Sequence, residues 1–196
     1  AVSIARRLQD PLAELVKIDP KALGVGQYQH DMPKKELGET LDGAVEYCVN
    51  SVGADVNTAS PSLLSHIAGI NSGVAKNIVA YREENGAFTS RAQLKKVPKL
   101  GAKAYEQCAG FVRVPESKNV LDNTGVHPES YTAAKELLEL CGLTVKDAAK
   151  GNTGALKATV ELLGGDKKVA EKLGIGLPTL QDIVKELQKP GRDPRD

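Results

Sequence analysis

An internal repeat at an offset of 30 residues limits the possible folds of this chain more than any other feature of its sequence. Residues 64–71, with the sequence LSHIAGIN, align with residues 94–101, with the sequence LKKVPKLG. In each copy an apolar pair ends a short helix, a tight turn follows, and a second helix is expected, over residues 74–84 and 102–109. The repeat therefore predicts two helix-hairpin-helix units in tandem.

Local start and stop signals support this interpretation. Ser60-Pro61 has the form of an N-cap followed by proline at the first helical position. Thr89-Ser90 is expected to cap the first helix of the second copy, and Gly86 is expected to end the helix that lies between the hairpins.

A third copy of the layout follows later in the chain. Residues 173–183, with the sequence LGIGLPTLQDI, again predict a helix, a hairpin and a helix. We interpret this hairpin as a packing element, because Pro178 stands where the second copy has Lys103 and the surrounding sequence is net acidic.

Composition and periodicity favour an all-α fold. The chain has no Trp and only two Phe, so Leu, Val, Ile and Ala must fill most of the core. A helix is predicted over residues 33–52, with Gly53 as its cap, because apolar residues recur there at spacings of three and four. These residues are Leu37, Leu41, Ala44, Val45 and Cys48.

The chain is expected to divide into four parts. Residues 1–54 form a helical segment, residues 55–114 the tandem helix-hairpin-helix domain, and residues 115–189 a second helical domain with the third hairpin. Residues 190–196 form a polar linker. Within the first part, residues 24–28 (GVGQY) are interpreted as a turn, since no strand precedes the glycines to suggest a phosphate-binding loop.

The positive charge of the chain is concentrated around the tandem hairpins. The net charge is only +1, but residues 61–118 carry nine Lys and Arg against four Asp and Glu. Residues 1–60 carry six against nine, and residues 119–196 carry eleven against twelve. Because local fields attract anions more than total charge does, the hairpin region is the expected place for a polyanionic partner.

The hairpins have the chemistry of an anion site. A central apolar residue plugs the core, while backbone N–H groups of the loop and of the next helix N-terminus face outward. A phosphate of a nucleic-acid backbone fits such donors, so binding should be independent of sequence and weakened by salt. DNA and RNA are equally compatible with it.

The candidate binding residues come from both copies, and the second copy is preferred for its lysines. In the first copy Asn71 replaces a glycine and is expected to tolerate a left-handed conformation, with Lys76 and Arg82 as nearby cations. The full set of candidates is Lys95, Lys96, Lys99, Leu100, Gly101, Ala102 and Lys103, with Gly69, Ile70, Asn71 and Lys76.

No other chemistry is indicated. The three histidines, His30, His66 and His127, are far apart and unpaired with ligands at metal-site spacing, so we expect no metal, no cofactor and no catalytic residue. No small-molecule substrate is expected. No segment reaches the ~20 apolar residues needed to cross a membrane. Three scattered cysteines fit reduced thiols in a cytoplasmic protein.

Four blocks of sequence resemble the Tex family of bacterial transcription accessory proteins. They are residues 3–11 (SIARRLQDP), 24–31 (GVGQYQHD), 107–111 (QCAGF) and 122–131 (DNTGVHPESY). The resemblance, which extends to the eukaryotic elongation factor Spt6, implies a larger parent protein. In that parent a nuclease-like YqgF domain would precede this segment and an S1 RNA-binding domain would follow it, and no catalytic activity is implied.

Two functions stay open at this stage. The first is sequence-independent binding of the nucleic-acid backbone within a transcription accessory factor. The second is a structural scaffold that positions neighbouring domains, with RNA polymerase as a partner, which the degenerate first and third hairpins and the small net charge would favour.

Overall fold

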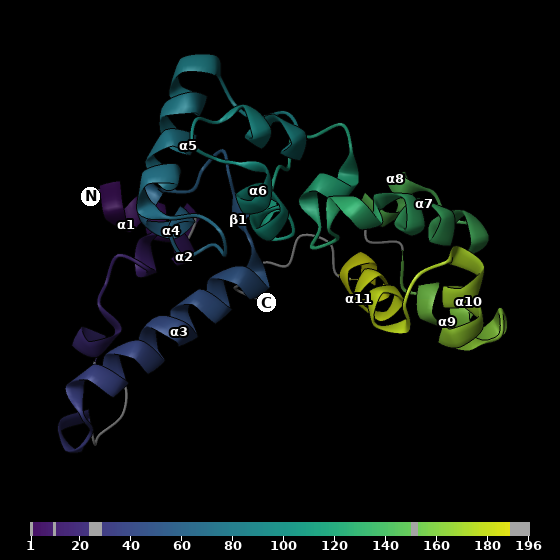
Figure 1. Cartoon of the computed structure of the whole chain (residues 1–196), viewed down its shortest axis with the longest axis horizontal. Coiled ribbons are helices and arrows are strands. Elements are labelled where there is room, and N and C mark those ends of the chain that lie inside the picture. Colours follow the sequence, from purple (N-terminus) through teal and green to yellow (C-terminus); the bar gives the residue numbers. More distant parts are fainter. Residues whose placement is uncertain (1, 10, 24–28, 150–152, 189–196) are drawn as a thin grey trace.

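The chain folds into two groups of helices that lie side by side (Figure 1). A computed structural model describes residues 2–9, 11–23, 29–149 and 153–188. Over these residues the all-α prediction is confirmed, with strand limited to two very short segments. The turn expected at residues 24–28 and the linker expected at residues 190–196 lie outside the described residues.

The first group, the N-terminal lobe, runs from α1 to β2. Before the hairpins it contains α1 (Val2–Gln9), α2 (Pro11–Leu15), the 3-10 helices η1 (Pro20–Leu23) and η2 (Gln29–Asp31), α3 (Lys34–Val52) and β1 (Ala54–Asp55). The hairpin region then contains α4 (Pro61–Leu64), α5 (Ser72–Asn85), the 3-10 helix η3 (Arg91–Lys96), α6 (Ala102–Cys108) and β2 (Val112–Arg113).

The second group, the C-terminal lobe, carries the third hairpin. It contains the 3-10 helices η4 (Val120–Asn123) and η5 (Pro128–Ser130), then α7 (Tyr131–Leu140), α8 (Val145–Ala149), α9 (Leu156–Leu162), α10 (Gly165–Leu173) and α11 (Leu177–Gln188). Gly174 has a φ of 66° between α10 and α11, as a helical hairpin at this place requires. Each lobe has its own cluster of buried apolar side chains.

Helix α3 occurs where its periodicity predicts it, and its apolar face is partly buried. Gly53, at a φ of 82°, ends the helix as expected. Val49 is buried, whereas Ala44 and Cys48 are exposed and Leu41 is half-buried. Figure 1 shows α3 extending away from the rest of the molecule. The spacing of apolar residues identifies a helix, and among the described residues this helix contacts η1 and η2 and packs Val45 and Val49 against the N-terminal core.

A short parallel pairing, absent from the sequence prediction, closes the tandem hairpin module. Ala54 pairs with Val112 and Asp55 with Arg113, so β1 and β2 join the two ends of the module. The backbone N–H of Val56 continues the ladder by donating to the Arg113 carbonyl at 3.0 Å. Two residues are too few for an alternating pattern to show in a sequence, which is why no strand was predicted.

The core of the N-terminal lobe includes the residues that the hairpins insert into it. Ile70 and Leu100, the predicted plugs, are only 4% and 5% exposed, and Leu94 and Val97 are buried beside them. Ser60 accepts a hydrogen bond from the Leu63 N–H at 3.2 Å, which confirms its role as the cap of α4.

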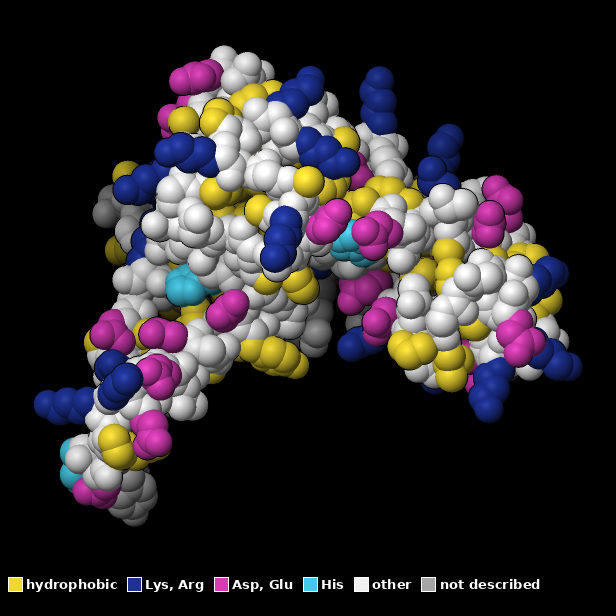
Figure 2. Space-filling view, viewed as in Figure 1, with side chains coloured by type: hydrophobic (Ala, Val, Ile, Leu, Met, Phe, Trp, Pro, Cys, Tyr) yellow, Lys and Arg dark blue, Asp and Glu magenta, His cyan; other side chains and the backbone are white. Residues whose placement is uncertain are grey.

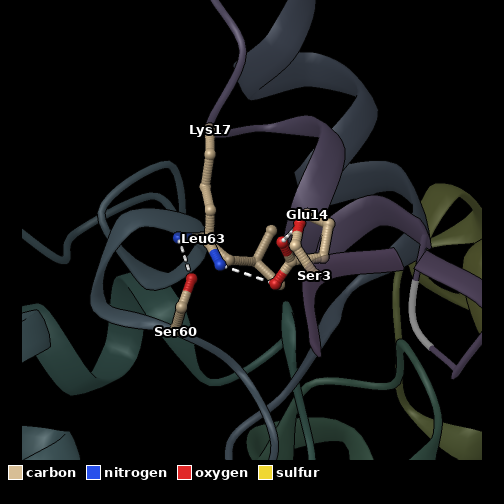
Figure 3. A network of polar contacts seen from close by, with 5 residues as sticks. All are labelled: Ser3, Glu14, Lys17, Ser60 and Leu63. Atoms are coloured by element: carbon tan, nitrogen blue, oxygen red, sulfur yellow. Dashed lines mark hydrogen bonds and ion pairs between the residues drawn. The ribbon is translucent and has the colours of Figure 1, made fainter. Parts of the chain in front are cut away.

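The two N-terminal helices pack against this core through α2. Ala13 joins the buried cluster, and α2 lies against α4 (Figure 3). Glu14 ties the segment together, since it accepts from the Lys17 ammonium at 2.6 Å and from the Ser3 hydroxyl at 3.0 Å. These two donors stabilise the carboxylate and hold the pKa of Glu14 below its ordinary value.

A buried arginine joins the two lobes. Arg91, 1% exposed, donates from its guanidinium to the carbonyls of Val112, Thr124 and Val126. It also donates to the Tyr131 hydroxyl, which in turn donates to Asp122 at 2.7 Å. Because its acceptors come from β2, from the segment after η4 and from α7, Arg91 fixes the hairpin module relative to the C-terminal lobe.

The carboxylate of Asp122 is the second centre of this junction. It accepts from the Arg91 backbone N–H at 3.1 Å and from the Ser117 hydroxyl at 2.7 Å. Burial, together with the hydrogen bond to this carboxylate, raises the pKa of Tyr131 well above its ordinary value. Tyr131 therefore stays a neutral donor at physiological pH.

Candidate nucleic-acid interface

The two tandem hairpins turn in the same way, although different residues make the turn. Gly69 and Lys99 occupy equivalent positions of the repeat, and both are left-handed, with φ of 79° and 65°. The expectation that Asn71 adopts a left-handed conformation is wrong. Asn71, at φ −86° and ψ 169°, is extended because it is the N-cap of α5.

The hairpins contact each other reciprocally. Asn77 of α5 donates from its side-chain amide to the Pro98 carbonyl of the second hairpin at 2.8 Å. Gln107, the counterpart of Asn77 in the repeat, lies against the first hairpin, where a Cβ on Gly69 would be 2.7 Å from its Cβ. Each loop thus packs on the second helix of the other unit, as expected of two units related by an approximate two-fold axis.

The two hairpins differ in how the second helix begins. In the first, the Asn71 side chain accepts from the Val74 N–H at 2.9 Å, so the residue caps its own helix. In the second, Gly101 occupies the cap position of α6 in the same extended conformation, but glycine has no side chain with which to cap. The first N–H groups of a helix have no partner within the helix, so those of α6 are open to an external acceptor.

The sequence also predicted that Ser90 or Thr89 caps the first helix of the second copy. Ser90 does hold the cap position of η3, but its hydroxyl makes no capping hydrogen bond. Instead the backbone N–H of Thr89 donates to the Gln93 side chain at 2.8 Å. The prediction is wrong in its chemistry because η3 is a 3-10 helix, whose tighter first turn is closed here by a side chain from within the helix.

Four lysines lie within six residues of Gly101, the cap position of α6. Lys95, Lys96, Lys99 and Lys103 are all exposed, as are Gly101 and Ala102, while Leu100 is buried as the plug. Within the part of the chain that the structure describes, none of the four lysines forms an ion pair. The second hairpin therefore presents cations that no ion pair holds, together with N–H donors.

Lys95 is oriented by an aromatic ring that sequence reasoning did not single out. Its Nζ lies 4.6 Å from the ring centroid of Tyr105 on α6. A cation over a ring face is held there by the quadrupole of the ring. This contact keeps the ammonium of Lys95 on the side of the hairpin where Leu100 and Ala102 also lie.

Lys99 holds a conformation that costs free energy. Among the described residues it is the only one other than glycine with a positive φ. The left-handed conformation costs a residue with a Cβ about 1–2 kcal/mol. The first copy avoids the cost with Gly69, so the second copy carries strain at the position where its sequence places a lysine beside the open amides.

The first hairpin has fewer cations available. Lys76 is exposed on α5, and its counterpart in the second copy is Glu106. Arg82, named with it as a nearby cation, donates to the carbonyls of Val56 and Ala59 at 2.7 and 2.8 Å. The guanidinium of Arg82 is thus occupied within the fold, and burial lowers its pKa. Of the other candidates in the first copy, Gly69 lies in the turn and Asn71 is the N-cap of α5.

The distribution of charge separates this face from α3. Figure 2 shows several Lys and Arg side chains over the part of the molecule that carries α5 and α6, and acidic side chains mixed with basic ones along α3, whose residues 34–52 carry four Asp and Glu against two Lys. A polyanion is attracted to the first surface and repelled by the second. This agrees with the charge division of the sequence.

The described residues contain neither a membrane-spanning helix nor a cluster of metal-ligating side chains. Within the described residues, no helix is long and apolar enough to cross a membrane. In the same residues, no group of three or more His, Cys, Asp or Glu side chains lies together in a way that could hold a metal ion.

Comparison with known proteins identifies both hairpin regions. Residues 49–113 match the family described as helix-hairpin-helix motif, and residues 119–195 match the family described as HHH domain. The whole chain is 55% identical to "Protein tex" of Bordetella pertussis and spans 24% of its length. It is 54% identical to "Transcriptional accessory protein Tex" of Neisseria gonorrhoeae and spans 25% of it.

A more distant relative is human. Over 97% of the chain, "S1 RNA-binding domain-containing protein 1" of Homo sapiens is 40% identical, and the chain again spans 24% of that protein. The chain thus corresponds to about a quarter of these relatives. Over that quarter it contains two helix-hairpin-helix domains and is homologous along its whole length to the Tex proteins.

Proposed function

We propose that this chain binds the phosphate backbone of nucleic acids, independently of base sequence, mainly through the second hairpin. The observation that carries the proposal is the uncapped N-terminus of α6 at Gly101, with four exposed lysines within six residues of it in the sequence. Amide donors and a helix dipole favour a phosphate there, and the lysines add the attraction at longer range. Nothing in this arrangement reads a base edge.

The first hairpin takes a lesser part in this proposal. Its α5 N-terminus is already capped by Asn71, so a phosphate would have to displace that side chain. Its exposed cation near the turn is Lys76. A tandem pair with one open and one self-capped hairpin would hold one strand more tightly than the other.

The names of the relatives support a role in transcription. One relative is called a transcriptional accessory protein, and another is named for an S1 RNA-binding domain. The chain spans only about a quarter of either relative. We propose that it is part of a cytoplasmic transcription accessory factor. Its contribution there would be to hold nucleic acid without catalysis. Metal-dependent nuclease activity that copurifies with the chain and is lost in hairpin variants would overturn the proposal that the chain is not a catalyst.

Fluorescence anisotropy across a salt series tests the proposal. Lys103→Glu should weaken binding to unrelated DNA and RNA sequences about equally and lower the slope of log affinity against log salt by about one. Lys135→Glu, a change of the same charge at an exposed position of α7, is the matched control and should leave the slope unchanged. Equal affinities and slopes for wild type and Lys103→Glu would show that the hairpin is not the contact.

A scaffold that contacts protein is the second candidate, and exposed apolar surface favours it. Leu8 of α1 is 78% exposed, Tyr47 of α3 is 75% exposed, and Leu162 of α9 is 87% exposed. RNA polymerase is the partner to test, with purified components after nuclease treatment. Binding that survives nuclease and is lost in Tyr47→Ser, while nucleic-acid affinity stays intact, would support the scaffold role.

A further inference from the structure

A groove of about 510 Å³ opens directly beside the second hairpin. It shares Leu100 and Ala102 with the hairpin, so it begins where the candidate phosphate site ends. Its volume lies within the ~300–1,000 Å³ that is usual for sites that hold small organic groups. Leu100, Tyr105 and Pro128 give the groove an apolar lining.

His127 fixes the wall of the groove that belongs to the C-terminal lobe. Its Nε2 is 2.9 Å from the Glu106 carbonyl, which can only accept, so this nitrogen carries the hydrogen. Its Nδ1 then accepts from the Glu129 N–H at 3.4 Å. The imidazole therefore bridges α6 and η5, and the groove has walls from both lobes.

The charges at the groove disfavour a phosphate. Two acidic residues, Glu106 and Glu129, line it against one lysine, Lys95, and a carboxylate oxygen of Glu129 lies 3.6 Å from Nδ1 of His127. The Lys95 ammonium is itself engaged with the Tyr105 ring. A neutral, flat group with N–H or O–H donors suits this combination of apolar lining and carboxylate acceptors. A nucleobase with its sugar is such a group.

We infer that this groove receives the base and sugar of a single-stranded nucleotide whose neighbouring phosphate is held by the second hairpin. The inference rests on the proposed function and specifies its substrate class. In a duplex the bases are paired and stacked, so a base could enter only after it left the stack, which costs free energy. The chain should therefore prefer single strands, or unpaired ends and loops, to continuous duplex.

Oligonucleotides with and without bases test this directly. A single strand with abasic positions keeps its phosphates but has nothing to place in the groove. Wild type should bind the base-bearing strand about tenfold more tightly than the abasic strand of equal length, at fixed salt. The double variant Glu106→Gln and Glu129→Gln should bind both strands with nearly equal affinity, although it carries two fewer negative charges.

Two further variants separate this inference from the function on which it rests. Glu136→Gln with Glu139→Gln removes two exposed carboxylates of α7 outside the groove and should keep the tenfold preference. Lys103→Glu should weaken both strands equally. If wild type binds both strands equally and Lys103→Glu weakens both, the groove inference is overturned and backbone binding stands. If wild type binds neither strand at low salt, both fail.

Discussion

Replacing Gly101 by asparagine tests whether the open amides of α6 are where a phosphate binds. The backbone at Gly101 is extended, at φ −74° and ψ 170°, and a Cβ there would have no atom within 4 Å, so the side chain fits. Asn71 shows what it would do, because it caps α5 from the equivalent position at 2.9 Å. Gly101→Asn should therefore make the second hairpin cap itself.

The magnitudes follow from the cap. An asparagine cap is a few tenths of a kcal/mol better than glycine, so stability should rise slightly. A phosphate would then have to displace a capping hydrogen bond of about 1 kcal/mol, which lowers affinity by about fivefold. No charge changes, so the salt slope should fall only if the phosphate contact is lost.

Gly101→Ala is the matched control for this substitution. It adds a Cβ in the same open space but has no group that can compete for the amides. It should lower stability and keep affinity within about twofold of wild type. Urea unfolding and anisotropy at one salt concentration measure both quantities. A stabilised Gly101→Asn with unchanged affinity would refute the assignment of the phosphate to these amides.

Three more predictions follow from buried and strained residues. Lys99→Gly should raise stability by about 0.5–1 kcal/mol, since relief of the left-handed strain exceeds the added freedom of the unfolded chain, yet weaken nucleic-acid binding; lower stability in urea would contradict this. Arg91→Leu should cost on the order of 3–5 kcal/mol in urea unfolding, because its buried acceptors lose their donor; a loss below about 1 kcal/mol would mean that the junction is dispensable. Burial raises the pKa of the Cys108 thiol to about 11, so alkylation followed by mass spectrometry should modify exposed Cys48 first and Cys108 only on unfolding; equal rates would contradict the fold.

The hairpins were accessible to sequence reasoning because their signals are local. An apolar plug, a glycine near it and a helix start recur within eight residues in each copy, so one alignment locates both loops, although it does not show that Lys99 makes the left-handed turn of the second copy. The same alignment, extended by six positions, pairs Asn77 with Gln107, the two residues through which the hairpins contact each other. That pair was missed because polar residues on a helix surface give no sign of a partner.

The junction between the lobes could not be predicted in this way. The sequence around Arg91 is that of an ordinary exposed helical arginine. Its acceptors are the backbone carbonyls of Val112, Thr124 and Val126, and because every residue has a carbonyl, they leave no signal in the sequence. The groove beside the hairpin depends on the same junction, since His127 and Glu129 come from the C-terminal lobe. Features built from backbone groups of distant segments leave no periodic or compositional trace.

The cap of the first hairpin shows a different limit. Asparagine is favoured both in left-handed turns and at helix N-caps, so its presence at position 71 did not decide between them. Only the position of Gly69, two residues earlier, determines that the left-handed role is already filled. The consequence is functional, because a self-capped first hairpin makes the second the main candidate for phosphate binding.

Backbone amide chemical shifts during titration with a short single-stranded oligonucleotide test the central claim most directly. Phosphate binding at the second hairpin should move the N–H signals of Gly101, Ala102 and Lys103 most, and added salt should reverse the movement. The signals of the third hairpin, around Gly174 and Ile175, should stay in place. Shifts centred on the third hairpin, or the absence of any shift at low salt, would contradict the account.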